Sequence, residues 1–267
     1  MSRVSVELEV PGLAFASLTD VGRVRKNNED AIGDPRLLGA LVGPPARLVA
    51  RGVLLAVADG MGGHADGEVA SRLAVEMLFR SYYSANDALS EDLRRAVEAA
   101  NEAVHRSNAG RAEAPGRHDS GRMGTTLVAA VLAGDQLHVA NVGDSRAYRI
   151  HGGVLSQLTL DHSFVAEELR AGVLSEADAR VFPYRNIVTR AIGGAEVQVD
   201  LFSAPWLPGD RLLLCSDGLH GVVPDDLVRE ALLGLPPGDA ARALIRIANA
   251  RGGPDNISVV VAARGGG

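Results

Sequence analysis

The stretch Leu212-Leu213-Leu214-Cys215-Ser216-Asp217-Gly218 is a short apolar run that ends on an aspartate beside a glycine. Two other stretches have the same form: Leu54-Leu55-Ala56-Val57-Ala58-Asp59-Gly60 and His138-Val139-Ala140-Asn141-Val142-Gly143-Asp144. Each run has the length of a buried strand. One Asp-Gly pair alone is typical of a turn. Because a buried carboxylate is costly unless it is paired or binds a cation, three such strand ends raise the hypothesis of a metal site.

The composition is that of an ordinary globular protein, with 267 residues, 46% hydrophobic and 22% charged. The formal charge of −6 argues against a nucleic-acid or membrane-surface binder, which needs a basic face. The single cysteine, Cys215, excludes an intramolecular disulfide and is interpreted as a small core residue. The N-terminus has no apolar signal core and no stretch approaches 18 uninterrupted apolar residues, so we expect a cytoplasmic protein without a membrane span.

Hydrophobic periodicity predicts many strands and several paired helices. The expected strands are 4–10, 13–19, 53–58, 125–132, 136–142, 146–151, 197–203, 210–215 and 257–262. The expected helices are 66–83, a helix capped by Ser90 that runs past Val104, 164–171, a helix capped by Ser175, 224–233 and 239–250.

The remaining segments are expected to be loops and turns. Strands 125–132, 136–142 and 146–151, separated by short turns, predict an antiparallel meander. Residues 33–52 are interpreted as a connection with a short strand near 37–42, and 109–122 as a loop. Strands in runs and helices in pairs favour an α+β fold with antiparallel sheets covered by helices, rather than alternating βαβ units.

Five acidic features stand in loops after strand-like runs: Glu29-Asp30, Asp59-Gly60, Gly143-Asp144, Asp217-Gly218 and Asp255-Asn256. If these loops converge, the carboxylates repel each other strongly and persist only with cations or raised pKa values. Oxygen ligands alone suit Mg²⁺ or Mn²⁺ rather than zinc. Two ions about 3.5–4 Å apart could hold a water for attack on phosphorus. Arg25 could then hold the phosphoryl oxygens, although its spacing alone favours a solvated loop arginine.

Six segments in order carry a resemblance to a known family. They are 19–30 (TDVGRVRKNNED), 57–64 (VADGMGGH), 123–126 (MGTT), 142–146 (VGDSR), 215–219 (CSDGL) and 252–256 (GGPDN). With these motifs the chain resembles the metal-dependent protein serine/threonine phosphatases of the type 2C family, in their bacterial form. The segments span residues 19–256, nearly the whole chain. The resemblance implies a four-layer αββα sandwich in a single catalytic domain, 1–267, with a small helical flap at about 161–191.

The same resemblance implies roles for individual residues. Asp59 matches the carboxylate that bridges two catalytic ions, Gly60 a carbonyl ligand, and Asp217 and Asp255 the other direct ligands. Asp30 and Glu29 match residues that hold metal-bound waters, and Asp144 matches a ligand of a third, weaker ion. Arg25 matches the phosphate-binding arginine. The implied cofactors are Mn²⁺ or Mg²⁺, and the attacking group is a hydroxide that bridges the two ions.

The general acid and the substrate stay open. His64 could protonate the leaving serine or threonine oxygen, or it could only position a loop while a metal-bound water donates the proton. Thr125, Thr126, Ser145 and Arg146 are interpreted as structural, Arg146 as a loop anchor, and His162 as a buried histidine without a catalytic role. By analogy the substrates are phosphoproteins, among them a bacterial serine/threonine kinase and its targets, and the chain is expected to be a monomer that binds no nucleic acid. The alternatives are a small-molecule phosphoesterase with the same metal centre and a catalytically silent regulatory domain.

Overall fold

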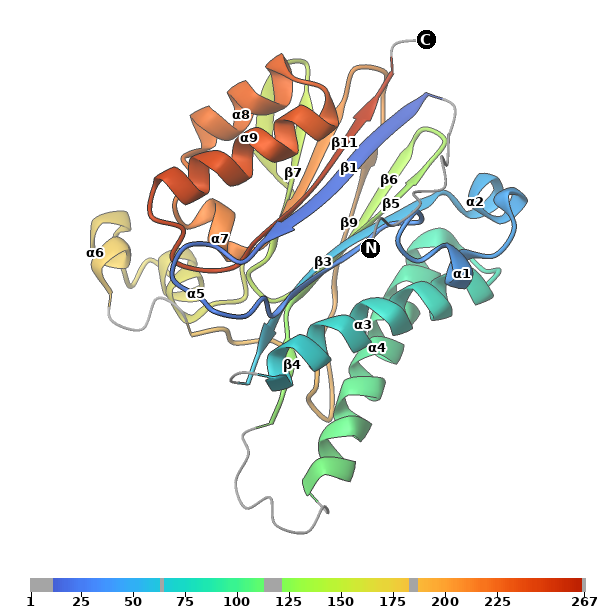
Figure 1. Cartoon of the computed structure of the whole chain (residues 1–267), viewed down its shortest axis with the longest axis horizontal. Helices are drawn as coiled ribbons and strands as arrows, with labels where there is room; N and C mark the ends of the chain where they lie inside the picture. Colours follow the sequence, from blue (N-terminus) through green and yellow to red (C-terminus); the bar gives the residue numbers. More distant parts are fainter. Residues whose placement is uncertain (1–11, 63–64, 113–121, 183–186, 266–267) are drawn as a thin grey trace.

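The computed structural model describes residues 12–62, 65–112, 122–182 and 187–265. Two antiparallel sheets form its centre (Figure 1). The five-stranded sheet has the order β1 (Leu13–Asp20), β11 (Ile257–Arg264), β10 (Arg211–Cys215), β7 (Arg146–His151) and β8 (Val154–Gln157). The six-stranded sheet has the order β2 (Asp30–Gly33), β3 (Val53–Met61), β5 (Leu127–Ala133), β6 (Gln136–Val142) and β9 (Asp200–Pro205), and β4 (Gly124–Thr125) pairs with the end of β3.

Helices cover the outer face of each sheet, so the predicted α+β sandwich of four layers is confirmed (Figure 1). Helices α3 (Ala65–Ser84) and α4 (Leu89–Ala112) lie over the six-stranded sheet. Helices α8 (Asp225–Gly234) and α9 (Pro237–Ala250) lie over the five-stranded sheet. The short helices are α1 (Gly39–Val42), α2 (Pro45–Arg51), α5 (Phe164–Arg170), α6 (Glu176–Val181) and α7 (Asp217–His220).

The alternation of side chains along β10 divides the apolar residues between two cores. Leu212 and Leu214 belong to the large core that lies between the sheets and continues under α3 and α4. Leu213 and Cys215 point the other way, into the core under α8 and α9. Successive strand residues face opposite sides of a sheet, so an apolar run without alternation fits a strand that is buried on both faces. Cys215 is a buried free thiol, which confirms its interpretation as a core residue.

Two predictions about local structure are wrong. The expected meander is broken, because β7 does not pair with β6 but crosses into the other sheet between β10 and β8. Gly143 turns the chain at this crossing with a φ of 108°, a conformation that favours glycine. The expected strand near 37–42 is instead α1, and α2 follows it. Proline at the first position of α2 is favourable because its missing N–H has no helical partner there, whereas proline disfavours a strand interior.

The remaining differences concern boundaries and short elements. Helix α4 begins at Leu89, so Ser90 lies inside the helix and not at its cap, and the helix extends to Ala112. Strands β2 and β8 and helix α7 were not predicted, since each has only four residues and too little periodicity to detect. Ser175 does cap α6, where its hydroxyl accepts a hydrogen bond from the Asp178 amide. The expected strand 4–10 and residues 113–121 of the expected loop lie outside the described residues. None of the described helices has the length and apolar character that crossing a membrane requires.

Candidate metal centre and active site

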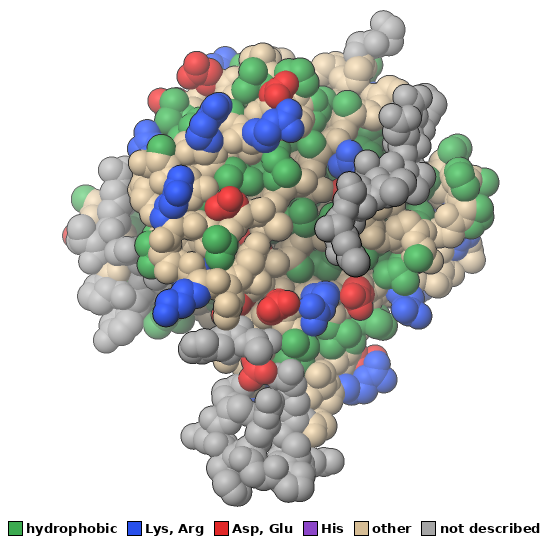
Figure 2. All heavy atoms as spheres, viewed as in Figure 1, with side chains coloured by type: hydrophobic (Ala, Val, Ile, Leu, Met, Phe, Trp, Pro, Cys, Tyr) green, Lys and Arg blue, Asp and Glu red, His purple; other side chains and the backbone are tan. Residues whose placement is uncertain are grey.

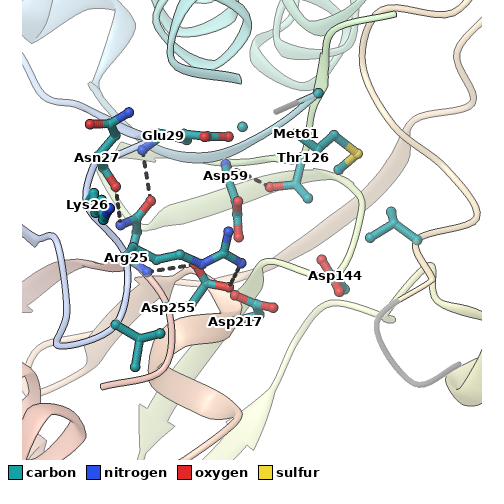
Figure 3. Close-up of a pocket in the computed structure, with 15 residues that line it drawn as sticks. Arg25, Lys26, Asn27, Glu29, Asp59, Met61, Thr126, Asp144, Asp217 and Asp255 are labelled. Atoms are coloured by element: carbon teal, nitrogen blue, oxygen red, sulfur yellow. Dashed lines mark hydrogen bonds and ion pairs between the residues drawn. The ribbon is translucent and has the colours of Figure 1, made fainter. Parts of the chain in front are cut away.

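An open cavity of about 650 Å³ lies where the ends of several strands meet, and acidic residues from distant parts of the chain line it. The charged residues on its wall are Arg25, Lys26, Glu29, Asp59, Asp144, Asp217 and Asp255. Figure 3 shows Asp59, Asp217 and Asp255 directed toward the side chain of Arg25, with Asp144 further to one side. Of the predicted site residues, His64 lies outside the described part of the chain, and Asp30 lies buried behind the wall.

Asp59 stands near the end of β3, where a neighbouring strand and two threonines fix its backbone. It is the register partner of Asp30 on β2, which places these two carboxylates side by side. The Asp59 amide donates to Thr126 Oγ1 at 3.0 Å, and the Thr125 hydroxyl donates to the Asp59 carbonyl at 2.8 Å. The interpretation of both threonines as structural agrees with these bonds. They leave the Asp59 carboxylate free to face the cavity.

Gly60 follows Asp59 at a position where the backbone of another element comes very close. A Cβ built on Gly60 would lie 2.2 Å from the carbonyl oxygen of Gly67 on α3 and 2.6 Å from that of Glu29. No real side chain tolerates such contacts. The glycine thus lets α3 and the Glu29 loop pack against the end of β3, and Gly60 and Glu29 both line the cavity.

Asp217 begins helix α7 directly after β10, and Ser216 before it supports another carboxylate. The Ser216 hydroxyl donates to Asp30 Oδ2 at 2.8 Å and accepts a hydrogen bond from the Ser258 amide at 3.0 Å. Asp30 Oδ1 and Asp217 Oδ1 are buried without a hydrogen-bond partner among the described residues. Buried oxygens of this kind are costly unless a cation or a proton satisfies them.

Asp255 lies in the loop before β11 and pairs with Arg25, whose Nη2 donates to Asp255 Oδ2 at 2.6 Å. The neighbouring Asn256 ties this loop to the loop that carries Arg25. Its Nδ2 donates to the carbonyls of Val21 and Asn27, and its Oδ1 accepts a hydrogen bond from the Glu29 amide. Asn256 therefore holds three segments of the site together. The residue is part of the motif 252–256, but the motif alone does not indicate this role.

The electrostatics of the cluster are those of carboxylates that share a buried space. Burial, assisted by the charges of Asp217 and Asp255, raises the pKa of Asp30 to about 7, although hydrogen bonds from Ser258 and Ser216 oppose this. Burial and the neighbouring carboxylates raise the pKa of Asp59 well above its usual value. Burial and the charge of Asp255 also raise the pKa of Asp217. Burial and the charge of Asp217 raise the pKa of Asp144 to about 7. A counter-charge nearby would favour the ionised form of all four carboxyl groups.

Asp144 lies in the crossover between the sheets, and partners from three directions fix its loop. His220 Nε2 hydrogen-bonds to the Asp144 carbonyl at 3.0 Å. The Gly143 amide donates to His162 Nδ1 at 3.1 Å, and His162 Nε2 lies 3.1 Å from Asp200. Arg146 forms a bidentate ion pair with Asp161, in which Nε donates to Oδ1 and Nη2 donates to Oδ2, and this confirms its interpretation as a loop anchor. His162 is buried and structural, as its sequence context indicated.

The donor set fits divalent cations that prefer oxygen. The cavity offers carboxylates and a backbone carbonyl and, among the described residues, no cysteine or histidine on its wall. The unpartnered oxygens of Asp30 and Asp217 point to the same conclusion. No three His, Cys, Asp or Glu side chains of the described part are already drawn together as a ligand shell.

Several residues of the site were not singled out from the sequence as candidates. Ser216 and Asn256 hold the acidic loops, and Val24, Met61 and Val188 form apolar parts of the wall. A serine beside an aspartate carries no signal of its own in one sequence. Val188 reaches the wall from the segment after α5 and α6, which a bridge between Ser163 and Val188 closes at its base.

The chain is similar in sequence to known proteins. The sequence profile of the family described as Protein phosphatase 2C matches residues 45–254. The serine/threonine phosphatase stp of Listeria monocytogenes is 40% identical over 253 residues, which are 92% of this chain and 94% of that protein. The phosphatase PstP of Mycobacterium tuberculosis is 38% identical over 262 residues, 98% of this chain but 46% of that longer protein.

Solved structures show the same similarity in three dimensions. The crystal structure of the M. tuberculosis phosphatase PstP/Ppp superposes with a TM-score of 0.80 at 38% identity, covering 95% of this chain and 99% of that one. The catalytic domain of PstP in complex with two manganese ions has a TM-score of 0.78 at 37% identity, covering 95% and 98% of the two chains.

Proposed function

The chain belongs to the protein phosphatase 2C family and is a bacterial-type protein serine/threonine phosphatase with binuclear metal catalysis, and on this premise we propose how its own residues divide the work. Asp59, Asp217 and Asp255, with the Gly60 carbonyl, hold the two catalytic ions. Asp30 and Glu29 hold water molecules around them. The observation that carries the proposal is a set of carboxylates gathered at an open cavity, in which Asp30 Oδ1 and Asp217 Oδ1 are buried without a hydrogen-bond partner among the described residues.

When bound, such ions lower the pKa of a water molecule and neutralise charge on the phosphoryl oxygens. Either Mn²⁺ or Mg²⁺ suits the oxygen donors. We propose that Asp144 contributes to a third, weaker ion, because its carboxylate lines the same cavity but lies apart from the others (Figure 3).

Arg25 is the proposed anchor of the phosphoryl group. Its side chain is about half exposed, at 53%, so it can leave Asp255 and reach a phosphate in the open cavity. The planar guanidinium then binds two phosphoryl oxygens at once. The proton donor to the leaving oxygen is either His64 or a water molecule.

The proposed substrates are proteins that carry phosphoserine or phosphothreonine, including a serine/threonine kinase and its targets. The names of the similar proteins support this choice. The intact carboxylate set supports an active enzyme over a silent regulatory domain, and an open cavity accommodates a protein side chain as well as a small ester. The single catalytic domain, the monomeric state and the cytoplasmic location expected from the sequence stay predictions.

One set of assays tests the proposal. Hydrolysis of p-nitrophenyl phosphate and of a phosphothreonine peptide is measured with Mn²⁺, with EDTA, and in the variants Asp59→Asn and Asp226→Asn. Asp226 is an exposed aspartate on α8 and serves as the matched control. We expect Mn²⁺-dependent hydrolysis of both substrates, lost with EDTA and in Asp59→Asn but kept in Asp226→Asn. Hydrolysis of the small ester alone would contradict the protein substrate, and no activity on either would contradict the catalytic roles.

A further inference from the structure

A second concavity, of about 450 Å³, lies between β1 and α9, outside the catalytic cavity. Among the described residues, its wall carries three arginines, Arg23, Arg242 and Arg246, and one acidic residue, Asp20. We call it the arginine groove. In Figure 2, which faces α9 and β1, several basic side chains surround this part of the surface. For a protein with a net charge of −6, such a local excess of positive charge departs from the average surface.

The cationic groups of the groove are available to a ligand. The side chains of Arg23 and Arg246 have no ion pair or hydrogen bond with the described residues, and both are exposed. Within the described part of the chain, Arg242 pairs only with Asp239 one turn earlier, and 66% of its side chain is exposed. Such a surface pair is worth at most about 1 kcal/mol and is easily exchanged.

The one carboxylate of the groove is already engaged. Asp20 Oδ1 accepts hydrogen bonds from the Gly22 amide at 2.9 Å and from Asn249 Nδ2 at 3.0 Å. These bonds hold the Asp20 carboxylate against the turn that follows β1. Leu18, Ile245 and Ala250 add aliphatic surface to the lining of the groove. A lining that combines cations with aliphatic surface suits an amphipathic chain that carries acidic side chains.

The spacing of the arginines suits an extended peptide. Arg242 and Arg246 are one helical turn apart, which places them about 6 Å from each other along α9. Alternate side chains of an extended chain lie about 6.6 Å apart on the same side. Two acidic residues separated by one position therefore match this pair.

The groove is also next to the active site. Arg23 lines the groove, whereas Val24 and Arg25 line the catalytic cavity, so one loop forms a wall of both. The Arg23 amide donates to the Gly253 carbonyl at 2.8 Å, which fixes this loop against the segment that carries Asp255. Two residues of chain span at most about 7 Å. A short peptide can thus occupy the arginine groove and the catalytic cavity at the same time.

We propose that the arginine groove docks an acidic segment of the protein substrate while its phosphorylated residue occupies the catalytic cavity. This inference rests on the proposed function, because it names the kind of phosphoprotein that the site prefers. The groove gives affinity and selectivity for substrates with alternating Asp or Glu near the phosphorylated residue. Its arginines are docking residues and take no part in the chemistry.

Direct binding tests the groove independently of catalysis. Fluorescence anisotropy measures binding of a labelled, unphosphorylated peptide with alternating Glu and Ala to the full chain in EDTA. The variants are the double change Arg242→Glu with Arg246→Glu and, as controls of equal charge, Arg106→Glu with Arg72→Glu on α4 and α3, whose side chains are also exposed. We expect about tenfold weaker binding in the groove variant only, since two exposed ion pairs are lost. Equal weakening in both variants would mean a general charge effect and overturn the proposal.

Kinetics provide the second readout. Phosphothreonine peptides with alternating Glu on the N-terminal side, on the C-terminal side, or with Ala in these places are compared with p-nitrophenyl phosphate. The groove variant is expected to raise KM for one acidic peptide about tenfold, with kcat and the small ester unchanged. Equal KM for acidic and Ala peptides, or a labelled single-stranded DNA that binds as tightly as the acidic peptide, would overturn the inference. No hydrolysis of any substrate would contradict the proposed function instead. The binding assay in EDTA would still test whether the groove binds the acidic peptide.

Discussion

Arg25 donates from Nη2 to Asp255 Oδ2 at 2.6 Å, so the proposed phosphate anchor is paired with a proposed metal ligand. The two residues are 230 positions apart in sequence, and Asn256 connects their loops. Since 53% of the arginine side chain and 31% of the aspartate side chain are exposed, the pair adds little to stability, at most about 1 kcal/mol. The ion pair matters for function, because a cation at Asp255 and a phosphate at Arg25 would each compete with it.

The change Arg25→Ala is therefore expected to leave the midpoint of thermal unfolding almost unchanged and to raise KM for a phosphopeptide roughly tenfold or more, by loss of a bidentate charged contact. Arg25→Lys keeps the charge and loses the fork geometry, so an intermediate KM is expected. Steady-state kinetics and a thermal melt check both statements. An unchanged KM in Arg25→Ala would remove this residue from the site.

Asp217→Asn and Asp144→Asn are expected to separate the main centre from the weaker site. Asp217 is half-buried beside Asp59, and Asp144 lies apart in the crossover loop (Figure 3). We expect Asp217→Asn to lower Mn²⁺ affinity by about 100-fold or more, by analogy with the 10–100-fold that supporting residues alone contribute. Calorimetric titration with Mn²⁺ measures it. Asp144→Asn should keep the tighter binding and lose only a weaker phase, and loss of all binding there would contradict the assignment.

The carboxylate cluster is expected to make stability after EDTA treatment fall as the pH rises. The pKa values of Asp30 and Asp144 are raised from about 3.9 in an unfolded chain to about 7. A raised pKa means that the folded state holds the proton more tightly, so this contribution is complete below pH 4 and is lost as the pH passes 7. Thermal melts between pH 5 and 8 should show a falling midpoint, with a flatter profile in the double variant Asp30→Asn, Asp144→Asn.

Mn²⁺ should reverse that trend, because it replaces the protons as the counter-charge. The increase in melting temperature on adding Mn²⁺ should accordingly be larger at pH 8 than at pH 5.5. An equal increase at both values would mean that the ion does not compete with protons at these carboxylates.

Ser216→Ala is expected to reduce Mn²⁺ affinity or activity roughly 10- to 100-fold, because the hydroxyl orients Asp30 and accepts the Ser258 amide. Ser156→Ala on β8, at an exposed position, is the matched control and should have no effect. A Mn²⁺ titration and the phosphopeptide assay measure both variants. If Ser216→Ala lowers only the melting temperature and leaves affinity and kcat intact, the serine is structural and does not position Asp30.

The sequence by itself determined the α+β class, most long strands and helices, and the acidic residues of the site. It could do so because these properties are local. Apolar runs such as 212–215 have the length and burial of strands, and aspartates at strand ends can be read without knowing their neighbours. The motif resemblance added roles to Asp59, Asp217 and Asp255 that spacing alone left open.

Only the tertiary structure decided which of these elements meet. The crossing of β7 into the other sheet, the register of Asp30 beside Asp59, and the contact of Arg25 with Asp255 all join residues that are distant in the chain. Such contacts depend on the packing of two sheets and on loop closure, which no local pattern encodes. The support that Ser216 and Asn256 give, and the arginine groove between β1 and α9, follow from the same packing.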